Sequence, residues 1–321
     1  VAMDFNHLHS ILGHPNNYTL RTTAHHHNIQ LKNEPTGPCK YCVRAKIRMK
    51  NIPRDANQAT RKGERILIDI SWVKTPSEGL NNYWLLVMDE FTHYLWSYFL
   101  PSKDYVTDRL MPFLRRLHVS QDLNIRYIRC DNAPENRMLQ QACYEDPDLN
   151  ITFEYTVPGT PQQNGKIERK FATLNGKCRA MLNAAEFNWD LRHRMWAHCA
   201  SLATLLDNVL IRKDVNRSPH KLWHGEDPPW MDNLQPFGTM ATVKHNQKIQ
   251  SKLKDRGYPA IYIGPAQDHS AEVHEFWNPK TKRRCQARNA VFLKQTYSEY
   301  YKLPVTEVAN LLASLDEKTQ V

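Results

Sequence analysis

Continuous and alternating apolar runs predict a sheet in the region that follows residue 60. The runs "RILIDISWV", "YWLLVMDEF" and "HYLWSYFL" are rich in β-branched and aromatic residues, and Asn, Gly, Thr and His separate them. Such runs are typical of consecutive antiparallel strands. Two further short runs, "NIRYIRCD" and "ITFEYTV", read as strands as well. We therefore expect five strands between residues 60 and 156.

Apolar residues also recur at helical spacing. In "DYVTDRLMPFLRRLHVS" one face carries Leu110, Phe113, Leu114 and Leu117. From Pro161 to about Asn183 an apolar stripe indicates a long helix, and its members are Ile167, Phe171, Leu174, Cys178 and Met181. The segment "EFNWDLRHRMWAHCASLATLLDNVL" predicts a second long helix, and "TEVANLLASLDE" predicts a short helix near the end of the chain.

Residues 240–294 return to short β runs spaced by Gly and Pro, which predict a small β-barrel. With 321 residues, the chain is too long for one ordinary core. We expect a multidomain α/β protein with domains at 1–55, 60–212 and 235–296, and a helical tail at 297–321. The Trp residues 223, 230 and 277 are expected in the packing of the core.

The net charge of the chain indicates which class of molecule it binds. Lys and Arg number 43 against 33 acids, a formal net charge of +10, which favours a polyanion such as nucleic acid. The longest clean apolar run, from Tyr83 to Met88, is far shorter than the roughly 20 residues of a membrane-spanning helix. Seven cysteines, of which only Cys39 and Cys42 are closely spaced, do not form a disulfide framework.

The first fifty residues contain two pairs with metal-ligand spacing. His9 and His14 have four residues between them, and Cys39 and Cys42 have two. This soft set of two imidazoles and two thiolates suits one structural Zn²⁺ and leaves no open coordination position. His7 remains an alternative to His9. The competing interpretation is that these are ordinary residues of a His-rich segment.

Three carboxylates form a second candidate constellation. Asp69 lies within an apolar strand, Asp131 follows the strand "IRYIRC", and Glu168 lies in the first turn of the long helix. If the two strands are neighbours, the aspartates can face each other while the helix brings Glu168 to them. Three convergent carboxylates make a hard oxygen site for Mg²⁺ or Mn²⁺, including two ions roughly 3.5–4 Å apart that promote phosphodiester displacement. A first-turn Glu could instead only complement the helix dipole.

Several of these segments resemble the integrase of a copia-type long-terminal-repeat retrotransposon. The resemblance is carried by "HSILGHP", "CKYC", "ILIDISW", "IRCDNAPEN" and "TPQQNGKIERKFATLNGKCRAML". It continues in "LQPFGTMATV", "KLKDRGYPAIYIG" and "FWNPKTKRRCQARNAVF", and covers roughly residues 7 to 295.

The resemblance implies three domains and an activity. A helical zinc-binding domain would precede a ribonuclease H-like core with a mixed five-stranded sheet, and a small SH3-like β-barrel that binds DNA would follow. The integrase would join the 3′ ends of element cDNA to chromosomal DNA. Asp69, Asp131 and Glu168 would be catalytic and would hold two Mg²⁺ or Mn²⁺, while His9, His14, Cys39 and Cys42 would hold one Zn²⁺.

Partners and location follow from the same resemblance. We expect double-stranded DNA as substrate, a dimer or tetramer, no membrane, and action in the nucleus after passage through a cytoplasmic virus-like particle. The sequence does not identify a host targeting factor. Candidate DNA contacts are Gln162, Gln163, Asn164, Lys166, Arg169, Lys170, Asn175, Arg179, Lys252, Lys254, Arg256, Lys282 and Arg283.

Two other readings remain open at this point. The chain could be a domesticated or inactive DNA-binding protein that keeps the integrase fold. It could also be a ribonuclease H-like nuclease, because hydrolysis uses the same metal chemistry.

Overall fold

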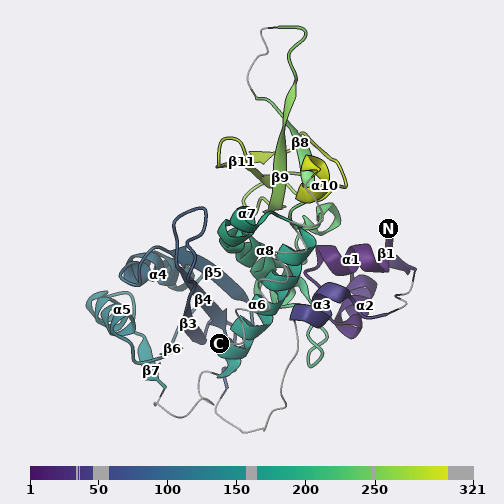
Figure 1. Ribbon diagram of the computed structural model, residues 1–321. Coiled ribbons are helices and arrows are strands. Elements are labelled where there is room, and N and C mark those ends of the chain that lie inside the picture. The colour runs from purple at the N-terminus through teal and green to yellow at the C-terminus, as the bar shows by residue number, and fades with distance from the viewer. Residues whose placement is uncertain (34, 36, 46–57, 157–164, 247–250, 303–321) are drawn as a thin grey trace. The chain divides into compact units, whose positions relative to one another are not determined.

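A computed structural model of the chain (Figure 1) describes all residues except 34, 36, 46–57, 157–164, 247–250 and 303–321. The described residues form two units. One unit contains Val1–Ala45, Lys177–Leu202 and the described part of the chain from Pro228 onward. The other contains the described residues between Lys46 and Gly176 together with Ala203–Asp227.

The second unit is built on a mixed five-stranded sheet. Its strands are β3 (Arg65–Trp72), β4 (Tyr83–Asp89), β5 (Leu95–Leu100), β6 (Tyr127–Cys130) and β7 (Thr152–Tyr155). They lie in the order β5-β4-β3-β6-β7. Strands β3, β4 and β5 pair antiparallel, whereas β6 and β7 run parallel to β3. The five predicted strands are confirmed, and the mixed sheet fits a ribonuclease H-like core.

Helices cover both faces of this sheet (Figure 1). Helices α4 (Tyr105–Arg115) and α5 (Pro134–Glu145) cover one face, where they form a hydrophobic core with Ile66, Ile68 and Ile128. A π-helical turn, Arg116–Ser120, extends α4. The predicted apolar face of this segment is confirmed, since Leu110, Phe113, Leu114 and Leu117 are all buried.

Helix α6 (Gly165–Ala184) packs on the opposite face, where the Phe171 ring meets the edge of Trp84 at 5.2 Å between centroids. The predicted stripe is confirmed, because Ile167, Phe171, Leu174, Cys178 and Met181 are all buried. The predicted start of the helix, at residues 161–164, lies outside the described residues.

The prediction of one long helix over residues 186–210 is wrong. The segment forms two helices, α7 (Trp189–Arg194) and α8 (Trp196–Val209). Asn188 caps α7 by accepting a hydrogen bond from the Leu191 N–H, and Glu186 has a positive φ of 51°, so the residues before α7 are not helical. Met195, with φ −81° and ψ 1°, ends α7 before α8 begins.

The Pro-rich stretch that follows contains the short helix α9 (Pro219–His224) and a 3₁₀ turn, Met231–Asn233. Ser218 begins α9 with a side-chain cap, and Gly225 ends it with a φ of 88°, a conformation that glycine adopts without strain. Trp223, Trp230 and Trp277 are buried, which confirms their predicted role in packing.

A second five-stranded sheet, entirely antiparallel, forms the β-rich region. Its strands are β8 (Met240–Lys244), β9 (Gly257–Pro265), β10 (His274–Asn278), β11 (Arg283–Ala287) and β12 (Ala290–Phe292), in the order β11-β10-β9-β8-β12. The run "RRCQARNAVFL" forms the two strands β11 and β12. Helix α10 (Tyr297–Tyr301) follows, and the predicted tail helix lies outside the described residues. The SH3-like assignment stays a prediction.

The N-terminal segment is helical, as predicted. It contains α1 (Phe5–Ile11), α2 (Asn17–His26) and α3 (Lys40–Ala45), with a parallel pair of short strands, β1 (Ala2–Asp4) and β2 (Gln30–Lys32). Asp4 and Asn16 cap the first two helices through their side chains. The bounds of the four predicted segments, 1–55, 60–212, 235–296 and 297–321, stay predictions. Throughout the described part of the chain, every helix is too short or too polar to cross a membrane.

Candidate metal centre and carboxylate site

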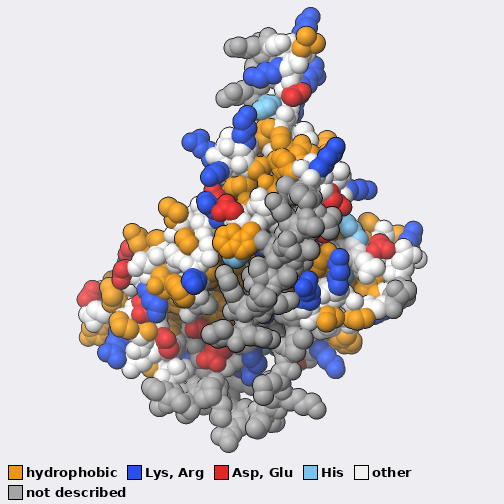
Figure 2. All heavy atoms as spheres, viewed as in Figure 1, with side chains coloured by type: hydrophobic (Ala, Val, Ile, Leu, Met, Phe, Trp, Pro, Cys, Tyr) orange, Lys and Arg blue, Asp and Glu red, His pale blue; other side chains and the backbone are white. Residues whose placement is uncertain are grey.

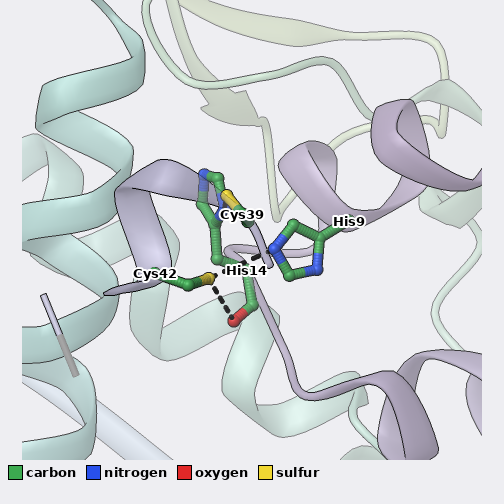
Figure 3. A group of neighbouring side chains, drawn as sticks. All are labelled: His9, His14, Cys39 and Cys42. Atoms are coloured by element: carbon green, nitrogen blue, oxygen red, sulfur yellow. Dashed lines mark hydrogen bonds between the residues drawn. The ribbon is translucent and has the colours of Figure 1, made fainter. Parts of the chain in front are cut away.

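The two predicted ligand pairs of the N-terminal segment lie together (Figure 3). His9 projects from the last turn of α1, and His14 follows that helix in a left-handed conformation with a φ of 58°. Cys39 comes directly before α3, and Cys42 lies within it. The helix ends therefore bring together residues that are up to 33 positions apart in the sequence.

The distances within this quartet fit a tetrahedral ion. His9 Nε2 lies 3.2 Å from Cys42 Sγ, and His14 Nδ1 lies 3.4 Å from Cys39 Sγ. With a Zn–N distance of about 2.0 Å and a Zn–S distance of about 2.3 Å, neighbouring N and S ligands are about 3.5 Å apart. One ligand atom from each residue lies within 4.8 Å of the others. The residues present therefore fit a structural Zn²⁺, with His9 Nε2 and His14 Nδ1 as the nitrogen donors.

His7, the alternative to His9, is exposed and is not part of the quartet. Residues two positions apart on a helix point about 200° away from each other, so α1 can turn only one of these histidines toward Cys42. Burial of His9 and exposure of His7 follow from the same geometry.

The two predicted aspartates lie at neighbouring positions of the sheet, Asp69 within β3 and Asp131 directly after the end of β6. Leu67 of β3 pairs with Arg129 of β6, and continuing that register by two residues aligns Asp69 with Asp131. Side chains alternate between faces along a strand. Ile128 and Cys130 point into the core beneath α4 and α5. Asp131 therefore shares the opposite face, which is the face that α6 covers.

Glu168 approaches this pair from the first turn of α6. Burial, helped by the charges of Glu168 and Asp131 and opposed by a hydrogen bond from the Ile70 N–H, raises the pKa of Asp69 to about 6. Asp69 is therefore close enough to both Glu168 and Asp131 for their charges to disfavour its ionisation. Asp69 is half-buried, whereas Asp131 and Glu168 are exposed, so the group opens to solvent at the carboxyl ends of β3 and β6.

Asn136, which the sequence reasoning did not single out, orients Asp131. It lies in the first turn of α5 and is buried. Its Nδ2 donates to Asp131 Oδ1 at 2.5 Å and to the Asp131 main-chain carbonyl at 3.1 Å. The position of Asn136 five residues after an aspartate that ends a strand, in the first turn of the next helix, is the signal that could have identified it.

The carboxylates are less closely gathered than the zinc quartet. Within the described ranges, only His9, His14, Cys39 and Cys42 form a cluster with the geometry of a metal site. Three like charges at short range repel one another, and a divalent cation would relieve that repulsion. The type of donor, rather than the spacing of the three groups, therefore fits Mg²⁺ or Mn²⁺.

A buried charge network beside α6 was also missed. Glu90, which is 3% exposed, accepts hydrogen bonds from Lys166 Nζ and Arg65 Nη1, both at 2.8 Å. Burial opposes the ionisation of Glu90, but these hydrogen bonds outweigh burial and lower its pKa. The sequence shows Glu90 only as the end of an apolar strand, next to Asp89, so its partners 25 and 76 positions away gave no local signal.

The residues of α6 that were predicted to contact DNA differ in exposure and in their bonding partners. Lys166 is bound to Glu90, and Lys170 Nζ lies 2.6 Å from Asp207 Oδ2. Arg179 is exposed and donates to the Ala45 carbonyl at 3.1 Å. Arg169 is exposed, and Asn175 is half-buried. The fold thus accounts for the charges of both lysines, and DNA contact by these five residues stays a prediction. Gln162, Gln163 and Asn164 lie outside the described residues.

The contacts predicted in the β-rich region lie at the surface. Lys and Arg side chains gather along the β8–β9 hairpin (Figure 2). Lys252, Lys254 and Arg256 are exposed in the connection before β9, and Lys282 and Arg283 are exposed where β11 begins. Their exposure suits contact with phosphates, which is a sequence-independent form of binding.

The sequence is similar to part of several Pol polyproteins. It is 26% identical over 297 residues to a retrovirus-related Pol polyprotein from transposon TNT 1-94 of Nicotiana tabacum, a match that covers 88% of this chain and 21% of that protein. The chain resembles copia-type retrotransposon Pol polyproteins. It is also 24% identical over 266 residues to the corresponding polyprotein of transposon RE1 of Arabidopsis thaliana, covering 82% of this chain and 18% of that one.

A more distant relative is the Pro-Pol polyprotein of simian foamy virus type 3 (strain LK3), which is 22% identical over 249 residues, or 77% of this chain and 20% of that protein. The chain spans about a fifth of the length of the Pol polyproteins it matches. No family model matches the sequence. Among solved structures, a chain of the simian T-cell lymphotropic virus intasome in complex with PP2A regulatory subunit B56 gamma has a TM-score of 0.41 at 16% identity, covering 78% of this chain and 84% of that one.

Proposed function

We propose that the chain is the integrase segment of a retrotransposon Pol polyprotein. It would join the 3′ ends of element cDNA to chromosomal DNA in the nucleus, as part of a homo-oligomer. The similarity to Pol polyproteins supports an integrase-like function. The observation that supports the proposal is that Asp69 lies in β3 and Asp131 directly follows the neighbouring strand β6, while Glu168 lies in the first turn of α6 and its charge acts on Asp69.

The roles of the carboxylates follow from their chemistry. When bound, two Mg²⁺ or Mn²⁺ ions would activate the attacking 3′ hydroxyl and stabilise the oxygen that leaves the target phosphodiester. Asp69 and Asp131 would hold this site from the sheet, and Glu168 would complete it from α6. Asn136 would fix the orientation of Asp131, because its two hydrogen bonds hold both the carboxylate and the main chain of that residue.

The zinc quartet would have a structural role. Its four ligands would leave no open position, so a bound ion would hold α1 to α3 without taking part in strand transfer. The exposed cations of the β8–β9 hairpin would bind the DNA backbone.

A strand-transfer assay tests the proposal. The purified chain, with Mg²⁺ or Mn²⁺ and a blunt donor duplex, should join the donor to plasmid DNA. Asp131→Asn should abolish joining, since it replaces a charged metal ligand with a neutral amide. Asp122→Asn is the matched control: Asp122 is exposed, lies before β6 rather than after it, and has a φ of 50° that asparagine tolerates.

Two results would refute the proposed function. One is a wild-type chain that forms no joined product while its zinc quartet is loaded. The other is a chain that cleaves RNA–DNA hybrids but does not join DNA, which would favour a ribonuclease H-like nuclease. Joining that survives equally in Asp131→Asn and Asp122→Asn would refute the assignment of the carboxylates.

A further inference from the structure

Two ion pairs of the same construction link the α4 segment to α5. Lys103 Nζ lies 2.5 Å from Glu135 Oε1 where the two helices begin, and Arg115 Nε lies 2.5 Å from Asp146 Oδ2 where they end. In both pairs the cation is exposed and the acid is buried: the side chains are 45% and 9% exposed in the first pair and 59% and 2% in the second. The two pairs therefore differ mainly in what surrounds them.

Only the first of these two pairs is close to the carboxylate site. Glu135 directly precedes Asn136, whose side chain holds Asp131. The hydrogen bond to Glu135 raises the pKa of Lys103, and the charge of Asp131 raises it as well. Arg115 lies at the opposite end of α4, and its partner Asp146 is bound by the main-chain N–H of Asp148. Lys103 is thus a cation at the edge of the carboxylate site.

The geometry leaves Lys103 able to bind an anion. A lysine ammonium group has three N–H donors, and the hydrogen bond to Glu135 uses one of them. The side chain is nearly half exposed, and its position is fixed by an acid that the helix buries. Fixing a flexible side chain before binding reduces the conformational entropy that is lost when a ligand binds.

We propose that Lys103 binds a phosphate of the DNA next to the carboxylate site, with Glu135 holding its ammonium group in place. The inference rests on the proposed function, because it takes DNA as the anion. It adds a contact that the basic patches of the sequence did not indicate, since Lys103 lies between β5 and α4 with an acid on its carboxyl side.

The competing explanation is that the ion pair of Lys103 has a structural role alone and holds the β5–α4 connection against α5. Arg115 supplies the control for this explanation, because its ion pair fastens the other end of the same helices. A fastening role predicts that the two pairs behave alike. A phosphate contact predicts that they differ in DNA binding and agree in stability.

The test is the salt dependence of binding to a short fluorescein-labelled blunt duplex, measured by anisotropy without added magnesium. Each phosphate contact contributes about 0.9 to the slope of log Kobs against log salt concentration. Lys103→Met should lower the slope by about 0.9, Lys103→Arg should keep it, and Arg115→Met should leave it at the wild-type value. Thermal unfolding of the same variants should show similar losses for Lys103→Met and Arg115→Met.

A charge-swapped variant separates the two roles further. Lys103→Glu combined with Glu135→Lys restores the ion pair but moves the cation to the buried position, so stability should recover while the slope stays low. Recovery of the wild-type slope in this variant would overturn the inference. So would an unchanged slope in Lys103→Met while the wild-type chain binds and joins DNA, and the proposed function would then stand. A wild-type chain that does not bind the duplex would overturn both.

Discussion

The zinc quartet and the carboxylate triad are two predicted metal sites that differ in how far the protein assembles them. In the quartet, nitrogen and sulfur ligands lie 3.2 and 3.4 Å apart and contact one another. In the triad, two aspartates lie at neighbouring positions of the sheet and Glu168 lies on α6, and the charges of Asp131 and Glu168 disfavour the ionisation of Asp69. An imidazole and a thiol can share a proton, so these ligands attract each other before a metal arrives. Carboxylates accept hydrogen bonds but, when ionised, cannot donate to each other.

The two sites therefore depend on different parts of the protein for the positions of their ligands. The quartet has its ligands in a segment of about fifty residues, so metal binding would supply folding energy to that segment. The triad is held by a sheet and helices whose cores are complete without it. Loss of metal should therefore affect the fold at the first site and the activity at the second.

The largest expected effect is removal of zinc. Structural Zn²⁺ contributes apparent binding energies of about 10–16 kcal/mol in small zinc domains. Cys39→Ser combined with Cys42→Ser should abolish zinc binding and the helical structure of α1 to α3, as measured by metal content and by hydrogen exchange. Cys285→Ser is the control, because Cys285 is half-buried in β11 and accepts a hydrogen bond from the Tyr258 hydroxyl. Unchanged protection of α1 in the double variant would contradict the structural role.

The second effect concerns the scaffold of the triad. Glu90→Gln leaves Lys166 and Arg65 without their buried carboxylate. Breaking a buried ion pair by removing one partner costs about 3–5 kcal/mol. We expect a loss of that size in the free energy of urea unfolding. Glu78→Gln, at a half-buried position in the β3–β4 connection, should change it by less than about 0.5 kcal/mol. Equal stability of the two variants would show that the Glu90 network contributes little.

The sequence predicted much of the architecture because apolar periodicity is a local signal. The strands β3 to β7 and the stripe of α6 are confirmed, since each is set by burial along one face. The break at Met195 was missed because the buried apolar residues Leu191, Met195 and Cys199 keep helical spacing across it. Spacing also predicted the quartet. His9 with His14 and Cys39 with Cys42 are local pairs, so only one long-range contact, between the two pairs, was left to infer.

The partners of the triad were harder to predict. Asp69 could be proposed because an acid within an apolar strand is unusual, and Asp131 and Glu168 from their places at the end of a strand and the start of a helix. Glu90 and Lys166 are 76 positions apart, and a charge pattern in the sequence cannot show which cation meets which acid. The lysine neighbours of Glu168 therefore suggested a DNA surface, whereas the fold binds two of them to Glu90 and Asp207.

A third test examines how the triad is oriented. Asn136→Ala removes the hydrogen bonds to Asp131, and loss of such a partner of a metal ligand costs about 10–100-fold in metal affinity or activity. Strand transfer should need a correspondingly higher Mg²⁺ concentration, and raising Mg²⁺ should restore part of the rate. Asn132→Ala is the control, since the Asn132 side chain binds Arg137 rather than a carboxylate of the site. A rate loss that Mg²⁺ does not relieve would contradict this role for Asn136.

The smallest effect on stability is expected far from both metal sites. Lys254 is exposed in the connection that leads into β9, so Lys254→Ala should change the free energy of unfolding by less than about 0.5 kcal/mol. If Lys254 contacts a phosphate, the salt slope of DNA binding should fall by about 0.9. Lys166→Met should show the reverse, with lower stability and an unchanged slope, because the Lys166 side chain is 31% exposed and pairs with a carboxylate that is only 1% exposed, against 45% and 9% for Lys103 and Glu135. If instead Lys166→Met lowers the slope while Lys254→Ala does not, the basic flank of α6 meets DNA and the hairpin does not.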